Sequence, residues 1–97
     1  MKQRWLPEAE REFDAAIDFL IERAGADIAT QFAAAVHSTA DRAAEFPALG
    51  APGLRRTRRL RVLHFPYVLV YRPTPRYVEI IAIAHQRRRP GYWAKRR

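Results

Sequence analysis

Residues 65–85 read FPYVLVYRPTPRYVEIIAIAH, and this stretch predicts two neighbouring strands of a β-sheet. Residues 67–71 are rich in aromatic and β-branched side chains, which are typical of strands. Residues 77–85 are almost continuously apolar, which predicts a central strand covered on both faces. Pro66 cannot donate a hydrogen bond to a neighbouring strand, so we expect a hairpin turn at Phe65-Pro66 and a second turn at residues 73–75.

The segments before this stretch complete an α+β domain. Residues 58–64 alternate, with Leu60 and Val62 on one face of a strand and Arg59 and Arg61 on the other. Apolar residues at helical spacing predict one helix from Pro7 to Gly25 and another that Asp27 caps and Pro47 ends. A short strand is expected at residues 2–6, and a loop at residues 47–53.

The predicted element order is therefore β-α-α-β-β-β. Two helices with so short a link form an antiparallel hairpin, and this hairpin is expected to pack on a small, mostly antiparallel sheet. We expect one domain over residues 1–97, with a basic tail at residues 86–97, because a chain of 97 residues can bury one modest core.

Charge is divided unevenly between the two halves of the chain. Residues 1–48 carry five Lys/Arg and nine Asp/Glu, whereas residues 49–97 carry thirteen and one, so the net charges of −4 and +12 give the total of +8. The net charge of +12 creates a positive electrostatic field around the second half of the chain, and such a field attracts polyanions or acidic protein surfaces. The chain has no cysteine, which excludes disulfides and thiol nucleophiles. No apolar run reaches the length of a signal peptide or a membrane span, so we expect a soluble, cytoplasmic protein without a membrane partner.

The basic tail carries the most specific group of candidate binding residues, which are Arg87, Arg88, Arg89, Tyr92 and Trp93. Arginine pairs bidentately with phosphate or carboxylate, and aromatic rings stack on bases. An alternative is equally open for Trp93: a large ring near the chain end pins the tail to the core, and the arginines only keep it soluble.

Arg59 and Arg61 form a second candidate surface. Leu63 and Phe65 extend their face of the strand, and this basic and apolar face either receives an acidic amphipathic peptide or is simply solvated. Asp14, Asp18 and Glu22 line one face of the first helix, which is either solvated or in contact with the basic half of the protein.

The histidines predict no metal site and no cofactor. None of the three, His37, His64 and His85, has metal-ligand spacing to another, and acids are scarce in the basic half. His85 is the one candidate for a general acid or base, because it lies where the apolar strand ends and the arginines begin.

With these segments in place, the chain resembles the ParE/RelE superfamily of toxins from bacterial type II toxin–antitoxin systems. The resemblance rests on the element order, the Phe46-Pro47 end of the second helix, the Phe65-Pro66-Tyr67 turn with Tyr71, and the apolar strand that ends in His85. It implies a toxin that a cognate antitoxin neutralises in a hetero-oligomer. That antitoxin is often a ribbon-helix-helix protein, and we expect it to offer an acidic amphipathic tail.

The superfamily contains two mechanisms, and this chain is more similar to ParE. ParE-like members inhibit DNA gyrase without hydrolysis of their own, whereas RelE-like members cut mRNA on the ribosome. RelE-like enzymes carry an arginine at the position of Val68, and the loss of one such charge costs about 3–4 kcal/mol of transition-state stabilisation. His85, Arg87 and Tyr92 (or Trp93 in the other register) remain as a reduced nuclease site. The alternatives are therefore a ribosome-dependent endoribonuclease or a non-toxic binding module.

Overall fold

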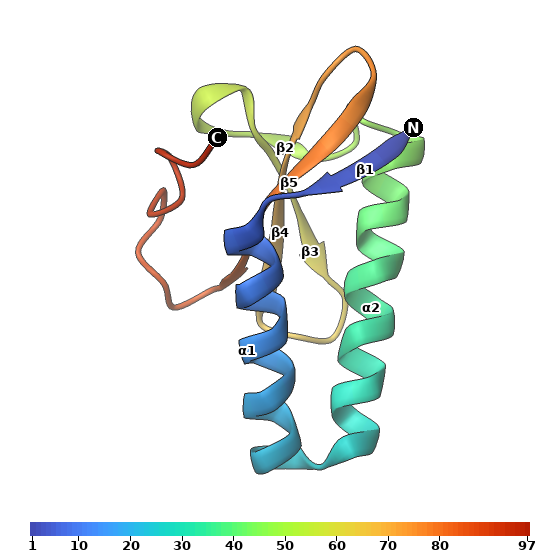
Figure 1. Ribbon diagram of the computed structural model, residues 1–97, viewed down its shortest axis with the longest axis vertical. Helices are drawn as coiled ribbons and strands as arrows, with labels where there is room; N and C mark the ends of the chain where they lie inside the picture. The colour runs from blue at the N-terminus through green and yellow to red at the C-terminus, as the bar shows by residue number, and fades with distance from the viewer.

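The computed structural model describes residues 1–97 and contains two helices and a five-stranded sheet. In chain order the elements are β1 (Lys2–Trp5), α1 (Pro7–Ala24), α2 (Ala26–Glu45), β2 (Ala51–Pro52), the 3₁₀ turn η1 (Leu54–Arg56), β3 (Arg58–Val62), β4 (Tyr67–Pro73) and β5 (Tyr77–His85). The helices run side by side along one face of the sheet (Figure 1). This arrangement confirms the predicted α+β fold.

The sheet has the strand order β1-β5-β4-β3-β2. Only the β1–β5 pair is parallel, and the other three pairs are antiparallel. β5 lies inside the sheet between β1 and β4, and residues 80–84 are all buried, which confirms the prediction of a central strand. β1 ends early: its pairing stops at Trp5–Ile80, and the Leu6 N–H adds one bond to the Ile80 carbonyl before α1 begins. The outer edge of β5 after Ile80 therefore has no strand beside it.

Gly25 separates the two helices. Its φ of 93° lies in the left-handed region, which glycine adopts without steric cost, and its N–H bonds to the carbonyls of Leu20 and Ile21. The prediction that Asp27 caps α2 is wrong. Gly25 holds the cap position and no side chain bonds there, while Asp27 lies within the first turn, where its charge favours the positive end of the helix dipole.

The core lies between the helices and the sheet. α2 contributes Phe32 and Val36, which are fully buried, and Phe32 contacts the rings of Phe65 and Tyr67 across the interface. α1 is attached more loosely, since Ala9 and Ala16 are its only buried residues. Neither helix combines the length with the apolar composition that crossing a membrane requires.

Tyr71 fixes the loop that leaves α2. Its buried hydroxyl donates to the Pro47 carbonyl at 2.7 Å and accepts the Gly50 N–H at 2.9 Å. Residues 51–52, which we expected within the loop, instead form the short edge strand β2. Sequence patterns cannot reveal a strand of two residues that includes a proline, although an edge position tolerates one.

Candidate functional site

The candidate site lies on the sheet face opposite the helices. Arg59 pairs with Val70 and Arg61 with Val68 in the β3–β4 register, so all four side chains point to this face. Val68 in turn pairs with Ala84 of β5. The result is a floor of small apolar residues with arginines at its β3 edge, as the alternation in the sequence predicts.

The basic tail folds back beside this floor and turns it into a cavity. Successive turns close through the bonds Tyr92 N–H to Arg89 O, Ala94 N–H to Gly91 O and Arg96 N–H to Trp93 O. The cavity has a volume of about 600 Å³. Of the predicted binding residues, five line it: Arg59, Arg88, Arg89, Tyr92 and Trp93.

The other two predicted binding residues, Arg61 and Arg87, are exposed and lie outside the lining of the cavity. Trp93 is only 9% exposed and belongs to the hydrophobic core, so it forms a wall of the cavity and pins the tail. Arg88 lies over the Tyr92 ring, with its guanidinium carbon 3.9 Å from the ring centroid. Arg59, Arg88 and Arg89 are the exposed arginines of the lining, and they give the cavity its positive charge.

Glu12 of α1 anchors the tail. Its carboxylate accepts the Tyr92 hydroxyl at 2.5 Å and two guanidinium N–H groups of Arg96 at 2.8 and 3.0 Å. It also accepts the Ile83 N–H at 3.1 Å, while Arg96 donates to the Ile81 carbonyl at 3.1 Å. Glu12 and Arg96 thus form hydrogen bonds with the backbone N–H and C=O groups on the edge of β5 that β1 leaves unpaired. We call Glu12, Tyr92 and Arg96 the tail clamp.

The contacts of the tail clamp raise the pKa of Tyr92 and the pKa of Arg96. Burial and the neighbouring Glu12 carboxylate raise the pKa of Tyr92 well above its usual value, so the phenol keeps its proton as a hydrogen-bond donor. The Glu12 hydrogen bond raises the pKa of Arg96 further. Charge-assisted bonds of this kind are stronger than neutral ones, and the side chains of Glu12 and Arg96 are only 15% and 17% exposed. The tail is therefore part of the folded domain.

Glu12 was not predicted as a site residue from the sequence. The acids singled out there, Asp14, Asp18 and Glu22, are exposed and make no ion pair with the basic half. One signal was present: Glu12 lies three residues after Ala9 and four before Ala16, so it shares the buried stripe of α1. An acid on an apolar stripe needs a cationic or hydrogen-bonding partner.

His85 also lines the cavity, but its ring is turned away from the arginines of β3. It pairs with Tyr67 in the β4–β5 register, and the two rings meet edge to face with centroids 5.0 Å apart. Tyr67 contacts Phe32 of α2, so the His85 ring lies on the helix side of the sheet. Its Nδ1 accepts the N–H of Arg87 at 3.0 Å. The sequence could not show this, because the bulge between Val70 and Tyr71 shifts the β4–β5 register.

Comparison with known proteins identifies the family. A family model described as "ParE toxin of type II toxin-antitoxin system, parDE" matches residues 4–90. The chain belongs to the ParE toxin family. It is 37% identical over 83 residues, 84% of each chain, to a Sinorhizobium fredii (strain NBRC 101917 / NGR234) protein named "Putative toxin Y4kP".

The fold of this ParE-family protein is shared with a solved structure of the chromosomal ParDE toxin–antitoxin system from P. aeruginosa. The TM-score is 0.77 at 18% identity, over 88% of this chain and 95% of the other. The match to the ParE family model ends at residue 90, so Tyr92 and Arg96 of the tail clamp lie beyond it.

Proposed function

We propose that this ParE-family toxin inhibits DNA gyrase and performs no mRNA cleavage. The observation that supports this choice is that the candidate nuclease side chains His85 and Tyr92 are engaged in other contacts, although both border the cavity, and that Val68 supplies no charge. The His85 ring lies on the helix side of the sheet, the Tyr92 hydroxyl is donated to Glu12, and Val68 occupies the position of a catalytic arginine. General acid–base catalysis needs such groups within hydrogen-bond reach of one reacting centre.

We further propose that the cavity and its rim receive the cognate antitoxin. Val68, Val70 and Ala84 offer an apolar floor, and Arg59 and Arg89 are exposed members of the lining. An amphipathic segment fits this surface if its apolar side chains face the floor and its carboxylates face the arginines. Arg61 and Arg87 extend the positive field beyond the cavity. The partner that suits this surface is an acidic tail, such as that of a ribbon-helix-helix antitoxin, in a toxin–antitoxin hetero-oligomer.

Purified toxin in a gyrase supercoiling assay tests the target. We expect loss of supercoiling and a trapped cleavage complex at micromolar toxin, and equal inhibition by the variant His85→Ala. Addition of the antitoxin that is encoded with the toxin is expected to restore supercoiling. Wild-type protein that leaves gyrase fully active at these concentrations would contradict the proposal.

The same preparation separates the alternatives. Cleavage of ribosome-bound mRNA that His85→Ala abolishes would establish the endoribonuclease instead. Induction in cells without antitoxin covers the remaining case, because normal growth with abundant folded protein would identify a non-toxic binding module.

A further inference from the structure

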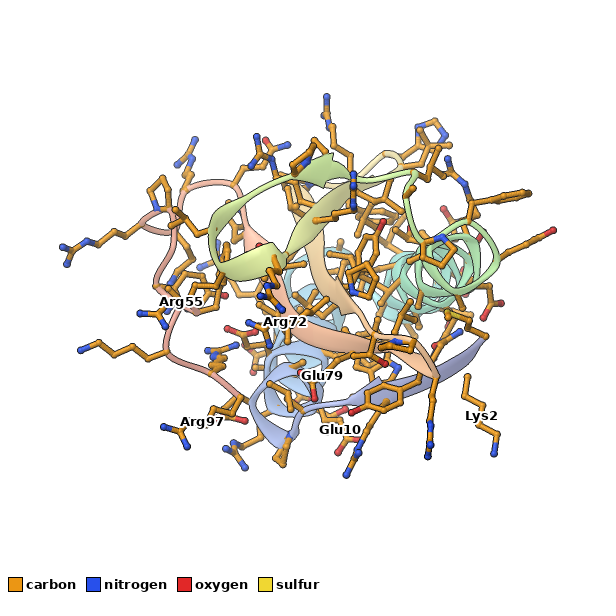
Figure 2. The ribbon with its side chains drawn as sticks, turned by 90° about the horizontal axis from the view of Figure 1, so that it is seen from above. Lys2, Glu10, Arg55, Arg72, Glu79 and Arg97 are labelled. Atoms are coloured by element: carbon orange, nitrogen blue, oxygen red, sulfur yellow. The ribbon has the colours of Figure 1, made fainter.

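A second basic hollow lies at the end of the molecule where η1 meets the end of the tail. Its volume is about 770 Å³. Six of its eight lining residues are cationic: Arg55, Arg56, Arg72, Lys95, Arg96 and Arg97. Figure 2 shows Arg55, Arg72 and Arg97 around this end of the molecule, and Lys2 at the opposite side. We call this hollow the basic basin.

Most of the charge in the basic basin is not neutralised within the protein. Arg72 pairs with Glu79 at 3.1 Å, and Arg96 pairs with Glu12 in the tail clamp. These are the two ion pairs of the chain, so the remaining four cations of the basin have no carboxylate partner: Arg55, Arg56, Lys95 and Arg97. Guanidinium groups stay charged at every physiological pH, so the basin is a permanent site of positive potential.

The turn that carries Arg55 and Arg56 has a strained backbone. Arg55 and Arg56 have φ values of 53° and 62°, a conformation that strains residues with a Cβ atom. Arg72 Nε donates to the Arg55 carbonyl at 3.0 Å, and the buried Thr57 closes the turn through a 2.6 Å bond to the Leu54 carbonyl. A defined turn therefore presents the two arginines, and the hydrogen bond from Arg72 of β4 holds that turn in place.

The composition of the basin distinguishes between classes of polyanion. A protein partner gains most of its affinity at well-packed Trp, Tyr and Arg anchors, and the lining of the basin contains no aromatic residue and only Ala94 as an apolar one. Single-stranded nucleic acid needs aromatic faces for its bases, and these lie in the other cavity, at Tyr92 and Trp93. Duplex DNA presents phosphates without exposed base faces, so a hollow of arginines without aromatic residues suits it.

We propose that the basic basin is a binding site for the phosphate backbone of duplex DNA. We expect the site to read charge and not sequence, because phosphate contacts carry no sequence information. This inference is independent of gyrase inhibition: it concerns the free toxin and a bare duplex, so either proposal can fail alone.

The test is fluorescence anisotropy of a labelled, arbitrary-sequence duplex of about 20 base pairs, titrated with toxin between 50 and 200 mM salt. Four neutralised phosphates give a slope of about −3.6 for log K against log salt, because each contributes about −0.9. Affinity then falls about 150-fold across this range. The variant Arg55→Gln/Arg56→Gln is expected to halve the slope, so that its affinity falls only about tenfold.

Two further variants make the test specific. Lys95→Gln/Arg97→Gln removes two basin charges from a different segment, and it should reproduce the halved slope even if the η1 variant folds poorly. Lys2→Gln/Arg23→Gln removes the same charge from exposed residues on β1 and the far end of α1, and it should leave the slope within about 0.5 of wild type. Thermal melting verifies that each variant is folded.

Three results would overturn the proposal. Equal slopes for the basin and control variants would show binding by net charge alone. Tighter binding of a single strand, lost in Tyr92→Ala, would place nucleic acid in the cavity instead. Tighter binding of a poly-glutamate peptide of equal charge would assign the basin to an acidic protein.

Discussion

Replacement of Glu12 by glutamine is the sharpest test of how the tail is held. The carboxylate accepts four hydrogen bonds: two from Arg96, one from Tyr92 and one from the Ile83 N–H. Glu12→Gln preserves the shape of the side chain but removes its charge. The amide NH₂ of the glutamine is itself a donor, so it cannot accept the hydrogen bonds that one carboxylate oxygen of Glu12 accepts. Arg96 then stays 17% exposed beside a neutral partner.

The magnitude follows from the burial of the pair. Removal of one partner from a fully buried pair costs about 3–5 kcal/mol. Partial exposure and the oxygen that glutamine retains lower this figure, so we expect a loss of about 2–3 kcal/mol. For a domain of this size that loss lowers Tm by roughly 10–20 °C. The clamp also holds Trp93, so its fluorescence should shift to the red in native buffer as the tail leaves the core.

Glu10→Gln is the matched control, because Glu10 lies on the same helix, is exposed and accepts no side-chain bond. Urea and thermal denaturation should show a change within about 0.5 kcal/mol for this surface substitution. A Glu12→Gln variant as stable as Glu10→Gln, with unshifted tryptophan emission, would refute the reasoning and show that packing of Trp93 alone secures the tail.

Three other outcomes are expected. Tyr92 has a raised pKa, so its contribution to stability is complete below the unfolded pKa of about 10.0 and is lost as the pH rises further. Tyr92→Phe should therefore reduce the loss of stability at alkaline pH in denaturation experiments. Part of that loss should remain, because burial also raises the pKa of Tyr67. Gly50→Ala would place a Cβ atom 2.8 Å from the Tyr71 hydroxyl, and should cost about 1–3 kcal/mol in urea denaturation, whereas an unchanged midpoint would mean that the loop moves freely. Antitoxin association should slow as salt rises, when followed by stopped flow, and a salt-independent on-rate would show that apolar contacts dominate.

The strands could be predicted from the sequence because their patterns are local. The near-continuous apolar run at residues 77–85 marks the interior strand, and Pro66 marks the hairpin before β4. The helices follow from their apolar stripes and from Gly25. β2 was missed because two residues carry no periodicity, and Asp27 was misassigned because a glycine can hold the cap position without any side chain.

The candidate site was predicted in part. Alternation along β3 placed Arg59 and Arg61 correctly on one face, and the tail arginines and aromatics largely meet there. His85 was grouped with them, yet its ring lies on the other side of the sheet. The basic basin was not foreseen either, because Arg55 and Lys95 come together only through the path of the tail.

The sequence by itself determined the α+β class, the family, the central strand and the division of charge between helices and sheet. The class, the central strand and the division of charge follow from composition or from periodicities of two and 3.6 residues, which act over a few neighbouring positions, whereas the family follows from the resemblance of its motifs. Tertiary structure alone decided what the charges do. The carboxylate of Glu12 meets Arg96 across 84 positions of sequence, and it does so because β1 ends early and leaves the edge of β5 open. The bond between Glu12 and the tail makes residues 86–97 part of the domain, and the path of that tail separates the apolar cavity from the basic basin.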